Sequence, residues 1–579
     1  MSGETTTDDG RDRSGTVTLP HAEAPSADQR APADESAGAG GSVLKSSAVM
    51  AVGTTASRIT GFARTIVLAA ALGTQLLGDA YNTANTIPFI VYDLLIGGLM
   101  ASVIVPFLVK RRRSDADGGT ATEQRLFTGA VIALLALTVT AVLAAEALIR
   151  LYAGRFTPEQ FDVAVLLARY LLAQIFFVGV SGLSSAMLNT RNRFGAPVWA
   201  PVLNNLVIIC VGATFIWTAG TGATPDTVTD GQIALLGLGT TGGLLLQAAV
   251  VQFVLWRSGF RWRPRLDLRG SGLGEALKAA GWMFVLVCAM QTGFLITANL
   301  ANRAGVAMSE GAGVGGGLTA YNYAYQLFQL PYAIIAVSVI TVLLPRMSAH
   351  AAEHDWAKVR GDFSRGLRMS SVVLVPIGLA LAVYAVPLSV AVFARGSTSV
   401  DDARVIGSVL TVFALGLIPF TVYQLMLRVF YAMGDTRTPA LIAVTNAAVH
   451  GTIGTASYVL LPSDRVLMGI AAGFMLSYLW GLTVSGRILS RRLGGLDGWR
   501  IGSTIARLYS AALPCVAAAV AVQWLIGGWS AEELPVLLGG PLLGCAIGAP
   551  LFLATGHLLR VDEIRNAVQA ARKRLPRRA

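Results

Sequence analysis

The chain has 579 residues, of which 54% are hydrophobic and only 13% are charged. Together with a mean hydropathy of +0.60, this excludes a string of ordinary soluble domains and indicates a polytopic membrane protein. The formal net charge of +12 does not indicate a nucleic-acid partner, because the basic residues are scattered between apolar runs and form no single basic face.

The first segment, residues 1–41, is rich in small, polar and acidic residues and has almost no large apolar side chains. We expect a disordered cytoplasmic tail, since such a composition cannot build a core and contains no apolar signal-peptide region. The cysteines all lie inside apolar runs without paired spacing, so we expect neither disulfides nor a zinc site. They are Cys210, Cys288, Cys515 and Cys545.

Fourteen later segments are long and apolar enough to cross a bilayer, which takes about 20 residues each. The first six are residues 45–73, 80–109, 126–150, 161–189, 198–219 and 231–256. The next six are residues 274–301, 317–346, 367–394, 405–432, 439–461 and 466–489, and a last pair covers 504–527 and 535–559. The sequence therefore predicts an all-α polytopic membrane protein with about 14 transmembrane helices.

Lys and Arg concentrate in every second connection between these segments, as the positive-inside rule requires. KRRR at 110–113, the arginine cluster at 257–269 and the terminal RKRLPRR lie on one side, while connections such as TAGTGATPDTVTDG carry no positive charge. We therefore expect an even number of spans with both termini in the cytoplasm.

The two groups of six spans resemble each other at an offset of about 240 residues. DAYN at 79–82 recurs as TAYN at 319–322, and VIVP at 103–106 recurs as VLLP at 342–345. Six spans preserve orientation, so the sequence predicts two parallel repeats around a central cavity. The expected organisation is a tail at 1–41, an N-lobe at 42–256, a basic linker at 257–273, a C-lobe at 274–492, two extra helices at 493–560 and a basic tail at 561–579.

Two arginines, Arg58 and Arg64, lie in the first span. A helix that begins near Lys45 places Arg58 roughly 20 Å into the bilayer, where a charge costs about 2.5 to 3.5 kcal/mol. Asp93 in the second span can balance one of them, and the surplus positive charge favours an anionic substrate such as a phosphorylated lipid headgroup. Snorkelling or purely structural pairing of the arginines remains an alternative.

Neutral polar side chains also gather in the expected cavity. They can bind sugar or peptide, although Asn and Gln equally well form ordinary hydrogen bonds between helices. They are Asn82 and Asn85 in the second span, and Tyr321, Asn322, Tyr323, Tyr325, Gln326, Gln329 and Gln424 in the C-lobe, where the charged Arg428 accompanies them.

Two short motifs do not indicate an enzyme. HAAEH at 350–354 matches a zinc-protease pattern but lies in a short cytoplasmic connection, and GAGVGGG at 311–317 follows no strand, so we interpret the latter as a flexible linker. The sequence contains no P-loop and no G-x-S-x-G motif. These observations favour a carrier that needs no cofactor or metal.

Five segments together resemble the MurJ (MviN) lipid II flippases of the multidrug/oligosaccharidyl-lipid/polysaccharide exporter superfamily. They are SRITGFAR at 57–64, GDAYNTANTIP at 78–88, LNTRNRFGAPVWAPVLNN at 188–205, ITVLLPRMS at 340–348 and FYAMGDTRTP at 430–439. The resemblance covers most of residues 45–560. It implies two lobes around a V-shaped cavity and alternating access that moves undecaprenyl-pyrophosphate-linked peptidoglycan precursor, lipid II, to the outer face of the bacterial cell membrane.

With the resemblance added, the expected substrate-binding residues are Arg58, Arg64, Asp79, Asn82, Asp93, Gln326 and Gln329. Arg58 and Arg64 match the family's first-helix arginines, and Asp79 matches its acidic residue before the second helix. The expected partners are lipid II, the bilayer, and proteins of cell-wall synthesis or division. Coupling to the membrane potential or to an ion gradient is left open.

Some positions depart from the family pattern. Asp93 and Gly97 stand where the family carries charged residues after the second-helix proline, and Tyr325 and Gln326 stand where an Asp-Arg pair is expected. Two alternatives therefore stay open: an exporter of another polyprenyl-linked saccharide or of drugs on the same fold, and a non-transporting membrane scaffold of wall synthesis.

The predicted topology can be tested by cysteine labelling in a variant that lacks the four native cysteines. Single cysteines at Thr224 and Glu532 should react with an impermeant reagent added to intact cells, because their loops are expected outside. A cysteine at Ser114 should react only after the cells are permeabilised. The opposite labelling pattern would contradict the assignment of spans.

Overall fold

The computed structural model describes residues 35–93, 108, 117–265 and 273–566. Chain contacts separate residues 1–49 from residues 50–579. The described part of the first unit, residues 35–49, belongs to the beginning of helix α1 (Glu35–Leu72). The predicted tails at 1–41 and 561–579 lie mostly outside the described residues, as do residues 266–272 of the predicted linker at 257–273.

All regular structure in the described ranges is helical, which confirms the predicted all-α fold class. Ten helices there are long and apolar enough to span a membrane, or eleven if a pair bent by 53° counts as one span. The chain is thus a multi-span membrane protein. The predicted total of fourteen spans stays a prediction, since α1, α2 and α16 are not among the helices that meet this test.

The helices up to residue 257 form what we call the N-half. They are α1, α2 (Leu76–Tyr92), α4 (Thr120–Leu143), α5 (Ala145–Ala153), α6 (Pro158–Leu171), α7 (Gln174–Thr190), α8 (Gly195–Ala219) and α9 (Asp230–Arg257). Within it α8 packs on α9, α7 packs on α4 and α9, and α2 packs on α6.

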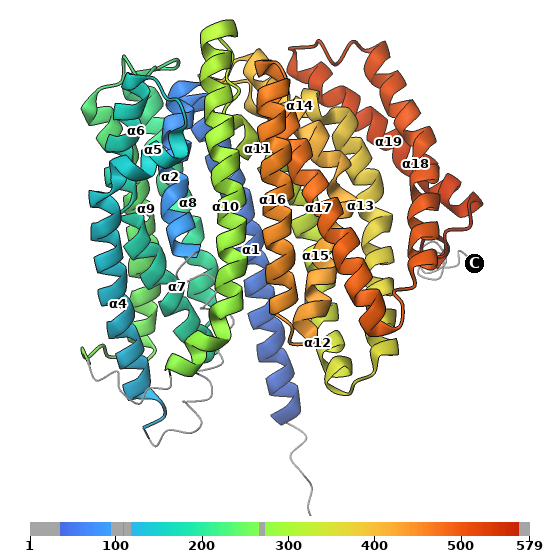
Figure 1. Ribbon diagram of the computed structural model, residues 1–579, viewed down its shortest axis with the longest axis horizontal. Helices are drawn as coiled ribbons and strands as arrows, with labels where there is room; N and C mark the ends of the chain where they lie inside the picture. Colours follow the sequence, from blue (N-terminus) through green and yellow to red (C-terminus); the bar gives the residue numbers. More distant parts are fainter. Residues whose placement is uncertain (1–34, 94–107, 109–116, 266–272, 567–579) are drawn as a thin grey trace, which may run out of the picture. The chain divides into compact units, whose positions relative to one another are not determined.

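The following helices form the C-half and a final pair. The C-half comprises α10 (Leu273–Ala312), α11 (Leu318–Pro331), the π-helix η3 (Tyr332–Ala336), α12 (Val337–Ala352), α13 (Trp356–Phe393), α14 (Val400–Leu415), α15 (Leu417–Ala432), α16 (Arg437–Leu460) and α17 (Ser463–Leu493). The final pair is α18 (Gly498–Leu525) and α19 (Leu534–Leu558), which pack on each other and on α13. Figure 1 shows α10 and α16 side by side, as their contacts require.

Hydrogen-bonded caps explain where several helices begin. Thr229 accepts a hydrogen bond from the backbone N–H of Gln232, whose side chain accepts one from the backbone of Thr229. Ser399 and Asp402 form the same reciprocal pair at the start of α14. Each pair satisfies N–H groups that the first helical turn leaves without partners, which stabilises a helix end by about 1 kcal/mol.

The motif FYAMGDTRTP forms the turn between α15 and α16. Asp435 accepts hydrogen bonds from the backbone and hydroxyl of Thr438 at 2.9 and 2.6 Å and from the Arg492 guanidinium at 2.6 Å. Partial burial tends to raise the pKa of the Asp435 carboxyl, but the bonds from Thr438 and Arg492 outweigh it and hold that pKa below its ordinary value. The carboxylate thereby joins this turn to the end of α17.

The lowered pKa of Asp435 predicts a pH-dependent contribution to stability. Ionised Asp435 stabilises the fold at pH values above its unfolded-state pKa of about 3.9, and this contribution is lost as the pH falls through the lower folded-state pKa. Asp435→Asn should therefore lower the melting temperature at neutral pH, and the difference from the parent should shrink below about pH 4. The exposed Asp464 provides the control variant Asp464→Asn, and a difference for Asp435→Asn that is constant with pH would contradict the interpretation.

Candidate functional site

A polar cavity of about 130 Å³ lies between the N-half and the C-half. The N-half contributes side chains from α1, α2, α7, α8 and α9, and the C-half contributes α11. The polar lining residues are Arg64, Thr65, Tyr81, Asn82, Asn85, Gln174, Asn204, Thr240, Asn322, Tyr323 and Gln326. Three of the predicted binding residues, Arg64, Asn82 and Gln326, thus share one cavity.

Arg64 is half-buried and supplies the positive charge of this cavity. Its Nη1 donates to Asn205 Oδ1 at 3.2 Å, and Asn205 Nδ2 donates in turn to the Thr60 hydroxyl at 3.1 Å. No carboxylate forms an ion pair with Arg64 in the described part of the chain. Because a guanidinium has five N–H donors, Arg64 retains donors for an anion that enters the cavity.

Hydrogen bonds cross the cavity from one half to the other. The Thr65 hydroxyl donates to Gln326 Oε1 at 2.9 Å, and Asn82 Nδ2 donates to the Thr319 hydroxyl at 3.1 Å. Both acceptors lie on α11. This helix is therefore held against α1 and α2 by neutral hydrogen bonds, each contributing about 1 kcal/mol.

Asp79 forms a further junction between the halves. It is 1% exposed, and its Oδ1 accepts a hydrogen bond at 2.8 Å from the backbone N–H of Thr319, the second residue of α11. A carboxylate at a helix N-terminus satisfies an otherwise unpaired donor and interacts favourably with the helix dipole. The structure thus places Asp79 beside the cavity, at a helix end, and not among the lining residues.

Glycines make the close approach at Asp79 feasible. A Cβ atom on Gly317 would lie 1.6 Å from Asp79 Oδ2, and one on Gly305 would lie 2.6 Å from it. Gly315 donates its backbone N–H to Asp402 Oδ1 at 2.6 Å. The interpretation of the glycine-rich stretch as a flexible linker is therefore wrong for Gly315–Gly317, which are buried, with the Gly315 backbone bonded to Asp402 of the C-half.

The connection between α13 and α14 closes the same end of the cavity. The backbone N–H of Ser397 donates to the Ala70 carbonyl at 2.8 Å, and the Thr398 hydroxyl donates to the Ala69 carbonyl at 2.7 Å. These bonds satisfy carbonyl groups at the C-terminal end of α1. At this end, the two halves are in direct contact.

A second cavity, of about 360 Å³, lies within the C-half. Its lining includes Tyr321, which the internal repeat aligns with Tyr81 of the first cavity. It also includes Asn446, which follows Pro439 by seven residues as Asn204 of the first cavity follows Pro197. Asn322 lines both cavities. The second cavity is also lined by Tyr325, Gln424, Arg428 and His450.

Three predicted residues do not join this arrangement. Arg58 is exposed on α1 and Asp93 is exposed at the end of α2, and neither side chain forms a hydrogen bond or ion pair with another described residue. Gln329 lies beside Tyr325 and outside the lining of the first cavity. The structure therefore does not bring Asp93 to either arginine.

Sequence reasoning missed several residues of the site. Asn205, which positions Arg64, and Thr319, whose N–H meets Asp79, gave no signal beyond their places in the repeat motifs. His450, whose Nε2 lies 3.3 Å from the Thr297 hydroxyl, was also missed. Among the residues that the structure describes, no group of His, Cys, Asp and Glu can hold a metal ion.

The architecture matches solved structures of transporters. A structure described as "Lipid II flippase MurJ, inward closed conformation" superposes with a TM-score of 0.69 at 19% identity, covering 89% of this chain and 99% of that chain. A multidrug resistance MATE family transporter of the MOP superfamily gives 0.59 at 16% identity, covering 76% and 95%. At such identities the likeness shows the fold, which is that of MOP-superfamily transporters.

Sequence comparison identifies the family. The family model described as "Lipid II flippase MurJ" matches residues 68–538. A probable lipid II flippase MurJ of Rhizobium meliloti is 28% identical, with 84% of this chain and 88% of the relative covered. The lipid II flippase MurJ of Burkholderia cenocepacia is 27% identical, with 67% and 73% covered. The chain belongs to the MurJ family, a family of transporters and not of enzymes.

The junction at Asp79 predicts how one glycine substitution changes the conformation. Gly317→Ala cannot keep the closed arrangement, since its Cβ would collide with the Asp79 carboxylate. A cysteine at Asn82 should therefore become more accessible from this end of the molecule. Gly311→Ala, which meets nothing within 4 Å, is the matched control. Equal accessibility in the two variants would contradict a closing role for the junction.

Proposed function

We propose that the chain flips the lipid-linked peptidoglycan precursor lipid II from the inner to the outer leaflet of a bacterial inner membrane. Membership of the MurJ family and the MOP-transporter fold support the substrate and the transport reaction. The observation that carries the proposal is Arg64, a guanidinium without a carboxylate partner in the described chain, in a cavity between two halves.

Chemically, the cavity suits a headgroup with one strongly anionic and several neutral polar parts. The remaining N–H groups of Arg64 can donate parallel hydrogen bonds to the pyrophosphate oxygens. The compact ammonium group of a lysine is less suited to this geometry. Asn82 and Gln326 can exchange their present partners on the opposite half for hydroxyl and amide groups of the substrate. Substrate binding would thus replace the hydrogen bonds that now cross the cavity.

Transport requires the cavity to open at one end at a time. The contacts at Asp79, Ser397 and Thr398 close one end, and with both termini in the cytoplasm this is the outer end. Outward release then requires the Asp79 carboxylate to leave the N-terminus of α11. The lost cap and hydrogen bonds cost a few kcal/mol, a barrier that thermal motion and substrate binding can overcome.

An energy source is available from the charge of the substrate itself. Each elementary charge that crosses the membrane gains or loses about 2.3 kcal/mol per 100 mV. With a negative interior, an anionic pyrophosphate moves outward in the favourable direction. We propose this coupling to the membrane potential before an ion gradient, and we propose cell-wall synthesis or division proteins as recipients of the product.

A second candidate is export of another polyprenyl-linked saccharide. The C-half cavity favours it, because Tyr325, at one position of the family's charged pair, lines this cavity together with other neutral Tyr, Asn and Gln side chains. These neutral groups bind hydroxyl-rich rings without selecting one headgroup. Purified protein that moves such a lipid but not lipid II would favour this alternative.

The proposal predicts a graded effect of substitutions at Arg64. In proteoliposomes that contain lipid II, Arg64→Ala should slow flipping at least about tenfold, the effect of losing charge-assisted hydrogen bonds to the pyrophosphate. Arg64→Lys should give an intermediate rate, since it keeps the charge and loses the fork. The rate is measured from the fraction of lipid II that reaches an enzyme or probe outside the vesicles.

Two controls make this experiment decisive. Arg465→Ala removes an exposed arginine that lies far along the chain from the cavity and should leave the rate unchanged. Arg58→Ala removes the exposed arginine of the same helix and should therefore slow flipping less than Arg64→Ala. A rate for Arg64→Ala equal to that of the parent, at equal protein in the vesicles, would refute the anion-site proposal.

A further inference from the structure

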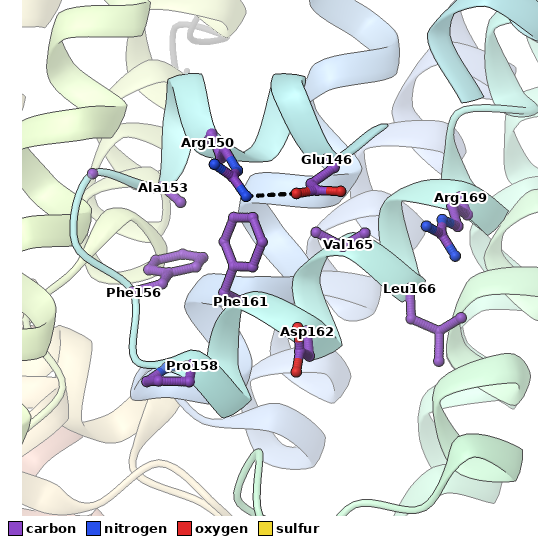
Figure 2. Close-up of a pocket in the computed structure, with 11 residues that line it drawn as sticks. Glu146, Arg150, Ala153, Phe156, Pro158, Phe161, Asp162, Val165, Leu166 and Arg169 are labelled. Atoms are coloured by element: carbon purple, nitrogen blue, oxygen red, sulfur yellow. Dashed lines mark hydrogen bonds and ion pairs between the residues drawn. The ribbon is translucent and has the colours of Figure 1, made fainter. Parts of the chain in front are cut away.

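A charged groove lies on the N-half away from the cavity, where α5 meets α6. Figure 2 shows the side chains that line it, with α5 above and α6 below. Its volume is about 770 Å³. The charged lining residues are Glu146 and Arg150 from α5 and Asp162 and Arg169 from α6, and the apolar ones include Phe156, Phe161 and Leu166.

Arg150 is already balanced within the groove. Its Nη2 forms an ion pair with Glu146 Oε1 at 2.6 Å, drawn as a dashed line in Figure 2, and its guanidinium carbon lies 5.7 Å from the centre of the Phe161 ring. The ion pair and the ring fix the orientation of the guanidinium beside the groove.

Asp162 and Arg169 are not balanced. Both side chains are exposed, and neither has an ion pair or hydrogen bond to any residue that the structure describes. Since they are seven residues apart, they lie on the same face of α6, roughly 10 Å apart along its axis. The groove thus presents one unpaired positive and one unpaired negative charge in line.

Arg169 lies too deep along its helix for its side chain to be surrounded by bulk water alone. It lies eleven residues into the apolar stretch Pro158–Thr190, roughly 16 Å from its start. This stretch is 33 residues long, or roughly 50 Å, and the bilayer core is about 30 Å thick. A centred helix therefore puts the Arg169 backbone several ångströms inside the core. Because side chains lean toward the start of a helix, the guanidinium reaches outward to the level of the lipid phosphates.

We propose that this groove binds the headgroup of a zwitterionic membrane phospholipid that carries a primary ammonium group. Arg169 receives the phosphate, and Asp162, nearer the helix start, receives the ammonium. This order matches the lipid, in which the phosphate is attached to glycerol and the ammonium lies farther out. The unpaired Asp162 carboxylate disfavours a purely anionic headgroup, while Phe161 and Leu166 provide apolar surface in the groove.

Native mass spectrometry of the full-length protein tests this inference directly. The protein is released from mild detergent after incubation with equal amounts of phosphatidylethanolamine, phosphatidylglycerol and phosphatidylcholine. The parent should retain phosphatidylethanolamine about fivefold over phosphatidylglycerol, the effect expected from one additional charge-assisted contact. Arg169→Gln should lose this retention, and Asp162→Asn should make the two lipids equal.

Two further variants test whether the effect of Arg169→Gln comes from the loss of any exposed arginine or from misfolding. Arg465→Gln, which removes an exposed arginine beside Asp464, should bind lipids like the parent. Arg169→Lys keeps the charge and should retain part of the binding, which separates a lost phosphate contact from a misfolded protein. Phosphatidylethanolamine retention by Arg169→Gln at the parent level, or a preference for phosphatidylglycerol in the parent, would overturn the proposal.

Phospholipid binding in the groove does not depend on the proposed flipping reaction. Lipid II, added as a fourth lipid, distinguishes the groove from the substrate site at Arg64. Lipid II binding should persist in Arg169→Gln, since its pyrophosphate is assigned to Arg64. It should be lost in Arg64→Ala, in which phosphatidylethanolamine binding persists. Loss of both lipids in Arg169→Gln would assign the groove to the substrate and overturn the proposal.

Discussion

The bond between the Asp79 carboxylate and the N-terminus of α11 joins the two halves at one end of the cavity. Buried carboxylates are costly unless hydrogen bonds satisfy them, and a helix N-terminus offers both donors and a favourable dipole. The internal repeat places Asp79 and Thr319 at equivalent positions, so the junction lies where the two repeats meet. The glycines around it, the contacts of Ser397 and the closure of the cavity are arranged about this one interaction.

The same repeat supplies two cavities, each lined by one arginine. Equivalent tyrosines and asparagines line both, with Arg64 in the cavity between the halves and Arg428 in the cavity of the C-half. Asn322 lines both cavities on α11, the helix whose N-terminus Asp79 caps. A movement of α11 that releases Asp79 therefore also changes the wall between the two cavities. Alternating access requires such a coupling between the Asp79 junction, which closes one end, and the walls of the cavities that bind substrate.

Much of this could be predicted from the sequence, because membranes restrict structure to helices and penalise unpaired charge. Apolar length located the helices, and the charges of Arg58 and Arg64 in the first span indicated a cavity. The direction in which each side chain points could not be predicted as the helices were, because it depends on packing against helices distant in sequence. Arg58 and Asp93 therefore lie outside the site, and the partner of Asp79 proved to be a backbone group, which no residue pattern reveals.

The central claim is that substrate binding at Arg64 shifts the protein away from the state closed at Asp79. The most direct measurement is the distance distribution between spin labels at Glu159 and Asp464, exposed residues at the start of α6 and of α17. Adding lipid II should populate a second, longer distance in the parent and leave the Arg64→Ala variant unchanged. A single distance that lipid II does not alter in the parent, or an equal change in both proteins, would contradict the account.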